Sequence, residues 1–66
     1  MTEYSTLFFN IMNEREMIQW AINNCNSFIY KTLKDVYYDE EGEFKSLHEF
    51  FFLTEQDAMW FRLYWE

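Results

Sequence analysis

The fold of this chain follows from residues 28–53, which read FIYKTLKDVYYDEEGEFKSLHEFFFL. Two stretches rich in β-branched and aromatic residues, 28–38 and 44–53, flank a polar turn at residues 39–42. Such residues favour strands, and Gly42 supplies the positive φ that a tight turn needs. Residues 50–53 are apolar at every position, which indicates a strand that is central in a sheet or lies at an interface. The segment therefore predicts a β-hairpin.

Upstream of the hairpin, residues 6–12 predict a first strand whose buried face carries Leu7, Phe9 and Ile11 at alternating positions. A helix follows, with Asn13 as its N-cap and Glu16 completing a pair that resembles a capping box. Its apolar stripe has helical spacing and consists of Met17, Ile18, Ala21, Ile22 and Cys25. Asparagines at positions 23, 24 and 26 favour a left-handed end of this helix near residues 24–26.

Downstream of the hairpin, Thr54 is a second N-cap, with Asp57 at the third helical position. We expect a short helix that ends near Trp60 or Phe61. Residues 61–65 alternate between large apolar and other side chains, and a continued helix would place apolar groups around its whole circumference. The pattern therefore favours a brief closing strand over a longer helix.

These elements predict an α+β fold in a single domain, residues 1–66, with the order β-α-β-β-α-(β). The expected architecture is a small antiparallel sheet covered on one face by helices. It corresponds to a ferredoxin-like, split βαβ arrangement or to a reduced version with three antiparallel strands under one or two helices.

The composition combines many aromatic rings with excess negative charge. Sixteen of the 66 residues are Phe, Tyr or Trp, and the formal net charge is −7. A chain of this size buries only about 60% of its unfolded surface, so some rings are expected on the surface as a contact site, or in a homodimer. The acidity opposes direct binding of nucleic acid and favours a partner with a basic surface.

The chain carries no signal of a secreted or membrane protein. Its first residues lack the basic and apolar regions of a signal peptide, and no apolar stretch reaches the roughly 18 residues of a membrane span. The single cysteine, Cys25, excludes an internal disulfide and fits a reducing compartment. We therefore expect a cytoplasmic protein without membrane contact.

No motif for catalysis, metal binding or a cofactor occurs in the sequence. His48 is the only histidine and has no companion at matched spacing. Cys25 lies near a helix C-terminus, where the helix dipole opposes a thiolate. The acidic turn does not follow a calcium-loop pattern. We expect neither enzymatic activity, nor a cofactor, nor a metal site.

The densest acidic cluster surrounds the turn of the hairpin. Same-face residues of a strand lie about 6.6 Å apart, and each DNA strand advances about 3.4 Å per phosphate, so spaced carboxylates can imitate a nucleic-acid backbone. A merely solvated loop is the plain alternative. Trp20 lies outside the stripe of the first helix and is a candidate surface anchor. The candidate partner-binding residues are Asp35, Asp39, Glu40, Glu41, Glu43, Trp20, Tyr30, Tyr37 and Tyr38.

Residues 52–65, which read FLTEQDAMWFRLYW, resemble the closing segment of small, mostly uncharacterised accessory proteins of tailed bacteriophages. Those segments have an acidic residue, Asp-Ala, two apolar residues and a basic-apolar-aromatic end. The resemblance covers about a fifth of the chain and carries over no functional residues. It implies a phage accessory product, many of which bind and block host enzymes that act on nucleic acid.

Two functions are therefore expected. The first is a non-enzymatic acidic module that inhibits or modulates a host nucleic-acid-handling protein in the host cytoplasm, with the acidic hairpin as a possible mimic of nucleic acid. The alternative is a small homo-oligomeric structural or assembly protein that pairs through an exposed aromatic sheet face, for which the face bearing Phe50 and Phe52 is the candidate.

Overall fold

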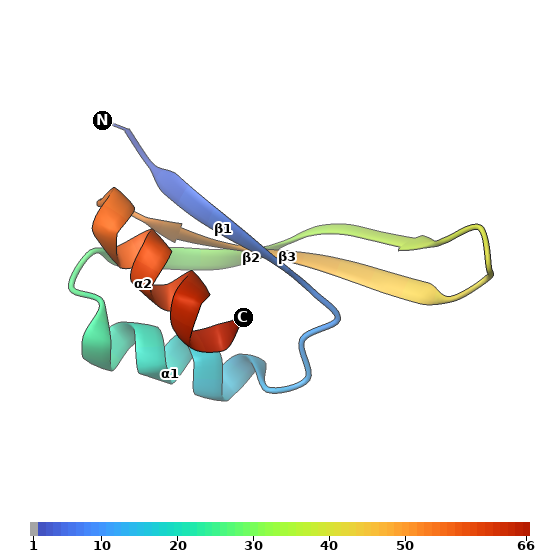
Figure 1. Cartoon of the computed structure of the whole chain (residues 1–66), viewed down its shortest axis with the longest axis horizontal. Helices are drawn as coiled ribbons and strands as arrows, with labels where there is room; N and C mark the ends of the chain where they lie inside the picture. The colour runs from blue at the N-terminus through green and yellow to red at the C-terminus, as the bar shows by residue number, and fades with distance from the viewer. Residues whose placement is uncertain (1) are drawn as a thin grey trace.

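The computed structural model describes residues 2–66 and forms a sheet with both helices on one side of it (Figure 1). The elements of these residues are β1 (Tyr4–Phe9), α1 (Glu14–Asn24), β2 (Phe28–Tyr38), β3 (Phe44–Phe52) and α2 (Glu55–Trp65). The sheet order is β1-β3-β2, and β3 pairs antiparallel with both neighbours. The prediction of an α+β fold is confirmed in its reduced, three-stranded version, and the central position expected for residues 50–53 is confirmed as well.

Both helices pack on the face of β3 that carries Phe50 and Phe52. These two rings are fully buried, together with Phe61 of α2. The rest of the buried core consists of Met17, Ala21, Cys25 and Ala58. The expectation that the Phe50 and Phe52 face is open was therefore wrong. Residues 50–53 are apolar on both faces, so their pattern alone does not say which face the helices cover.

The inward face of β1 is also the reverse of the predicted one. Leu7 and Phe9 are exposed, whereas Thr6 is buried. Phe8 packs edge-to-face on Phe50 and on Phe61, with ring centroids 5.8 and 5.7 Å apart. The register explains this result, because Thr6 lies opposite Phe50 and residues paired in this way share one face of the sheet.

Helix α1 has the predicted position but different ends. Asn13 precedes its first turn without a side-chain hydrogen bond, so the expected capping box is absent there, and the Asn13 carbonyl accepts the N–H of Met17 at 3.0 Å. At the other end, Cys25 has an extended backbone with φ −118° instead of a left-handed one. Thr54, in contrast, caps α2 as predicted, since its hydroxyl accepts the N–H of Asp57 at 3.3 Å.

Residues 61–65 continue α2 instead of forming the expected closing strand, so that prediction was wrong. The helical spacing places Ala58, Phe61 and Trp65 toward the core. Tyr64 points away from the sheet, and its ring stacks on Trp20 of α1 with a centroid distance of 4.4 Å. Contact between the two helices thus buries part of the aromatic surface that a continued helix carries around its circumference.

The start of α2 is fixed to the loop before β2 by a polar cluster. The Asp57 carboxylate accepts hydrogen bonds from the Ser27 N–H at 3.0 Å and from the Ser27 hydroxyl at 2.6 Å. The same hydroxyl lies 3.1 Å from Thr54 Oγ1. This cluster therefore joins the start of α2 to the loop that connects α1 with β2.

Candidate functional site

The outer half of the β2–β3 hairpin projects past both helices (Figure 1). We call residues 35–46 the hairpin arm. An 11-residue strand spans about 36 Å, whereas an 11-residue helix spans about 16 Å, so helices of this length cover only part of the hairpin. The molecule is accordingly elongated, with extents of 38 × 25 × 17 Å. Both faces of the arm are available for contact.

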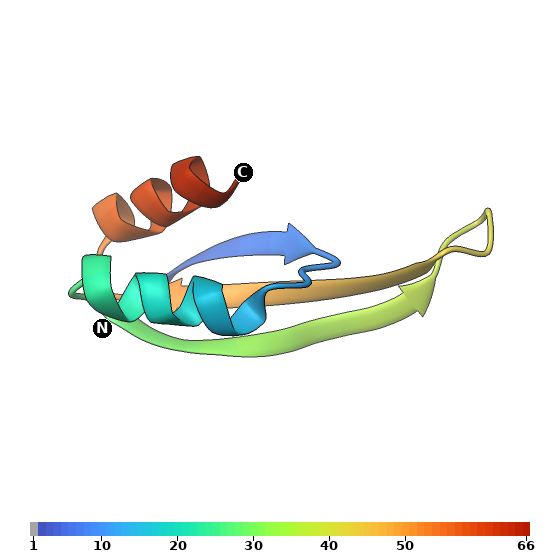
Figure 2. The same cartoon turned by 90° about the horizontal axis from the view of Figure 1, so that it is seen from below.

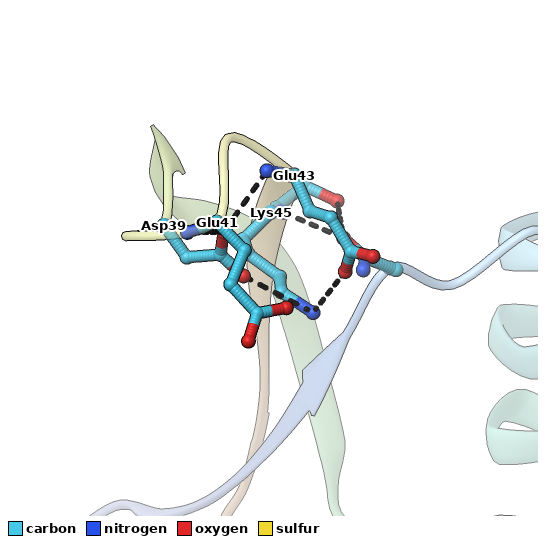
Figure 3. Close-up of polar contacts among 6 residues, drawn as sticks. Asp39, Glu41, Glu43 and Lys45 are labelled. Carbon is cyan, nitrogen blue, oxygen red and sulfur yellow. Dashed lines mark hydrogen bonds and ion pairs between the residues drawn. The ribbon is translucent and has the colours of Figure 1, made fainter.

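The tip of the hairpin arm is organised by Asp39. Its Oδ1 atom accepts the N–H groups of Glu41 and Glu43, each at 2.9 Å (Figure 3). The Asp39 carbonyl accepts the N–H of Gly42, whose φ is 82°. The predicted turn is therefore confirmed, and the Asp39 side chain holds its backbone together.

One lysine partly neutralises the acidic tip. Lys45 Nζ lies 3.9 Å from Asp39 and 3.5 Å from Glu43 (Figure 3). Glu40 and Glu41 are exposed. The hairpin arm holds five carboxylates and a single cation, which gives it a net charge of −4. Such a concentration of like charge at one end attracts a basic surface at long range.

Aromatic side chains lie beside the acidic tip on the same arm. Tyr37 lies opposite Lys45, and Tyr38 lies opposite Phe44. Tyr38 is 72% exposed and Phe44 is 52% exposed, and their rings meet edge-to-face at 5.7 Å. Large, exposed rings of this kind supply much of the binding energy of protein interfaces. The hairpin arm thus joins charge with apolar contact area.

The structure brings most of the predicted partner-binding residues together but keeps two of them elsewhere. The residues gathered on the hairpin arm are Asp35, Tyr37, Tyr38, Asp39, Glu40, Glu41 and Glu43. Trp20 is half-buried between the helices, where it stacks on Tyr64. Tyr30 stacks on Phe51 at 4.5 Å on the sheet face opposite the helices.

Sequence reasoning missed Val36 and Phe44, which are exposed on the hairpin arm. Their alternation with other residues resembles that of any strand, so composition alone did not separate them from core residues. The lengths of the predicted elements could have indicated this exposure. A strand rises about twice as far per residue as a helix, so the predicted helices are too short to cover the whole hairpin.

An ion pair between Glu14 and Lys31 connects the N-terminal end of α1 to β2. Lys31 of β2 is nearly buried, with 9% of its side chain exposed, and its Nζ lies 2.7 Å from Glu14 Oε1. This hydrogen bond lowers the pKa of Glu14. Burial, followed by the charge of Lys31, lowers the pKa of nearby His48. The contacts join α1 to the sheet.

His48 forms a pair with Ser46 that is unsuited to nucleophilic catalysis. Its Nε2 atom lies 3.0 Å from Ser46 Oγ, while its Nδ1 atom is buried without a hydrogen-bond partner among residues 2–66. A Ser–His pair acts as nucleophile and base when a third group orients the ring through the other nitrogen. We therefore assign no reaction to this pair.

Two further observations concern the part of the chain that the structure describes. No three His, Cys, Asp or Glu side chains there are grouped so that they could hold a metal ion. Neither helix has the length and apolar character needed to cross a bilayer.

Comparison with known proteins adds no relative. No family model, no curated protein and no solved structure matches the chain. The interpretation of the hairpin arm therefore depends on its own geometry and charge.

Proposed function

We propose that this chain is a non-enzymatic, acidic protein-binding module that inhibits or modulates a nucleic-acid-handling protein of a host cell. The observation that carries the proposal is the joint presence of five carboxylates and exposed aromatic rings on the projecting hairpin arm. The partner is a protein with a basic surface, of the kind that itself holds nucleic acid.

Charge and rings have different roles in this proposal. The net charge of −4 on the hairpin arm steers the module toward Lys and Arg on the partner and raises the rate of association. Tyr37, Tyr38 and Phe44 then bury apolar area in the contact. Asp39 and Glu43 share Lys45, so the geometry favours general charge complementarity over a row of carboxylates at phosphate spacing.

The proposed setting is the cytoplasm of a bacterium infected by a tailed phage, where the chain acts as an accessory product. This part of the proposal is supported by the likeness of residues 52–65 to the ends of such phage proteins. A small domain with a concentrated acidic charge suits a role in which occupying a surface is sufficient.

The test is affinity capture from bacterial lysate with the intact chain as bait, followed by mass spectrometry. We expect a basic, nucleic-acid-binding protein that is retained at low salt and is largely released at about 0.5 M salt, where the Debye length falls below about 5 Å. Added duplex DNA should compete for the same partner. Retention that is insensitive to both salt and DNA would contradict the proposal.

Self-assembly is the second candidate function, and one observation favours it. The sheet face opposite the helices carries exposed Leu7, Phe9 and Tyr30. An apolar surface of this kind on a small domain often marks an interface. Sedimentation at micromolar and higher concentration tests this candidate, and a strict monomer would remove it.

A further inference from the structure

The two edges of the described sheet differ in how they resist pairing. The β2 edge has register irregularities between Phe28 and Tyr30 and between Leu33 and Asp35, and it carries exposed Lys34. Bulges and charges of this kind block edge-to-edge association. β1, with the sequence YSTLFF, has continuous register with β3 and contains no charged residue and no proline. The β1 edge is therefore open to another strand.

The backbone of β1 offers hydrogen-bonding groups to such a strand. The N–H of Asn10 donates to the Ser46 carbonyl at 2.8 Å, so the positions that bond toward β3 are the even-numbered ones. In an antiparallel ladder the inward-bonding and outward-bonding residues alternate. The N–H and C=O groups of Ser5, Leu7 and Phe9 consequently point away from β3, toward the free edge.

A groove of about 610 Å³ runs along this edge between β1 and α2. Figure 2 shows α2 on the side of β1 that faces away from β3. The opposite wall consists of Glu55, Ala58, Met59 and Arg62 of α2 and of Glu66, which follows the helix. Leu7 is 48% exposed and Phe9 is 58% exposed at the same edge. The groove thus has the form of a slot for one more strand, bounded on one side by a helix.

We propose that β1 of a second copy of this chain occupies the slot in antiparallel orientation, forming a twofold-symmetric dimer with a continuous six-stranded sheet. A twofold axis at Leu7 places Leu7 opposite its symmetry mate and Ser5 opposite Phe9 of the second copy. Every outward-pointing group then faces another outward-pointing group, which is the self-complementarity that an isologous interface requires.

The charges at this edge are compatible with a second copy and favour one orientation. β1 is uncharged, and the wall of the groove carries both signs of charge, with Arg62 beside Glu55 and Glu66. β1 runs toward the hairpin arm, since its last residue, Phe9, lies opposite Leu47. Antiparallel pairing therefore directs the two acidic arms to opposite ends of the sheet. The small core of a 66-residue chain gives a further reason for association.

This dimer specifies the mode of the second candidate function and is independent of the binding proposed for the hairpin arm. The two respond oppositely to salt. Screening weakens attraction between the arm and a basic partner, whereas it relieves repulsion between two copies of the same acidic chain. Dimer formation should therefore strengthen as the salt concentration rises.

The first test is sedimentation of the purified chain over a range of concentrations at low and high salt. We expect a reversible dimer that Leu7→Lys weakens about tenfold or more, because two like charges then face each other across the axis. Tyr30→Lys is the matched control on the open sheet face, and we expect it to leave the dimer intact. A monomer at every concentration would overturn both the dimer and the self-assembly function.

The second test is residue-resolved amide exchange of the unmodified chain, which requires no variant to fold. Exchange at Ser5, Leu7 and Phe9 should slow as the dimer forms, because their outward N–H groups become bonded. A dimer that leaves these amides unprotected, or that Tyr30→Lys disrupts as strongly as Leu7→Lys, would overturn edge pairing while leaving self-assembly through the sheet face.

Discussion

Cys25 lies just after the last residue of α1, and its thiol is buried in the core, 3.9 Å from the carbonyl oxygen of Asp57. Burial, and to a smaller extent the nearby Asp57 carboxylate, raises the pKa of the Cys25 thiol to about 11. The reactive thiolate is therefore scarce at neutral pH. We expect a maleimide to label the native chain about 100-fold or more slowly than the unfolded chain. Equal labelling rates with and without denaturant would contradict the buried position.

Glu14 and His48 give stability a defined dependence on pH. The pKa of Glu14 is below its ordinary 4.5 because Lys31 donates a hydrogen bond to it. That contribution is complete above pH 4.5 and is lost as pH falls through the lowered pKa. The pKa of His48 is below its ordinary 6.5 because of burial and Lys31. Protonation of the unfolded chain therefore begins to reduce stability already below pH 6.5.

Urea unfolding at a series of pH values measures both effects. We expect the free energy of unfolding to fall below pH 6.5 and to fall further below pH 4.5. Glu14→Gln should flatten the lower part of this decline and cost about 1 kcal/mol or less at neutral pH, since Glu14 is half exposed. His48→Gln should flatten the upper part. A midpoint that stays constant down to pH 4 would refute this assignment.

At the scale of elements, α2 is the segment whose length matters most. Phe61 is fully buried and contacts the rings of Phe8, Phe50 and Phe52, with centroids 4.7 to 5.7 Å away. Phe61→Ala should cost about 3–5 kcal/mol, which approaches the whole stability of a domain of this size. Leu63 is 72% exposed, so Leu63→Ala should change stability by about 0.5 kcal/mol or less.

This pair of variants also distinguishes a helix from a strand. In a closing strand, residues 61 and 63 would share one face, and the two alanine substitutions would have similar costs. In the helix they point in different directions. Denaturant unfolding of both variants is sufficient, and a similar loss of stability for the two would contradict the helical end of the chain.

The predictable elements were those specified by local sequence. The hairpin followed from β-forming residues on both sides of Gly42, and the start of α2 followed from Thr54. The faces of β1 did not follow, because Leu7 and Phe9 are more apolar than Thr6 and Phe8, and yet Thr6 and Phe8 lie inward. Only the pairing of Thr6 with Phe50 decides between them, and that register is a tertiary property.

The sequence predicted most residues of the candidate site but not how far the hairpin arm projects. An acidic turn beside tyrosines marked most of the hairpin arm, but its projection past the helices depends on the relative lengths of strands and helices. The surroundings of Trp20 were not predictable for a related reason. Its position outside one helix stripe becomes the contact with α2, through Trp60 and Tyr64 at 5.5 and 4.4 Å.

At the scale of the whole molecule, exposed apolar area and excess negative charge lie on different surfaces. Apolar area is exposed along the open sheet face and the β1 edge, whereas negative charge is concentrated at the far end of the hairpin arm. In the proposed function, the acidic end steers the module toward a basic partner. We expect the two surfaces to respond oppositely to salt. As the salt concentration rises, binding of a basic partner by the hairpin arm should weaken, and pairing of two copies through β1 should strengthen.

The most direct test of the central claim is the affinity of the captured partner for two variants of equal net charge. Glu40→Lys with Glu41→Lys reverses the exposed charges of the tip, while Glu3→Lys with Glu16→Lys makes the same change outside the arm. We predict that the tip variant binds about tenfold or more weakly than the control variant at low salt, with both remaining folded by circular dichroism. Equal affinities of the two variants would contradict binding through the hairpin arm.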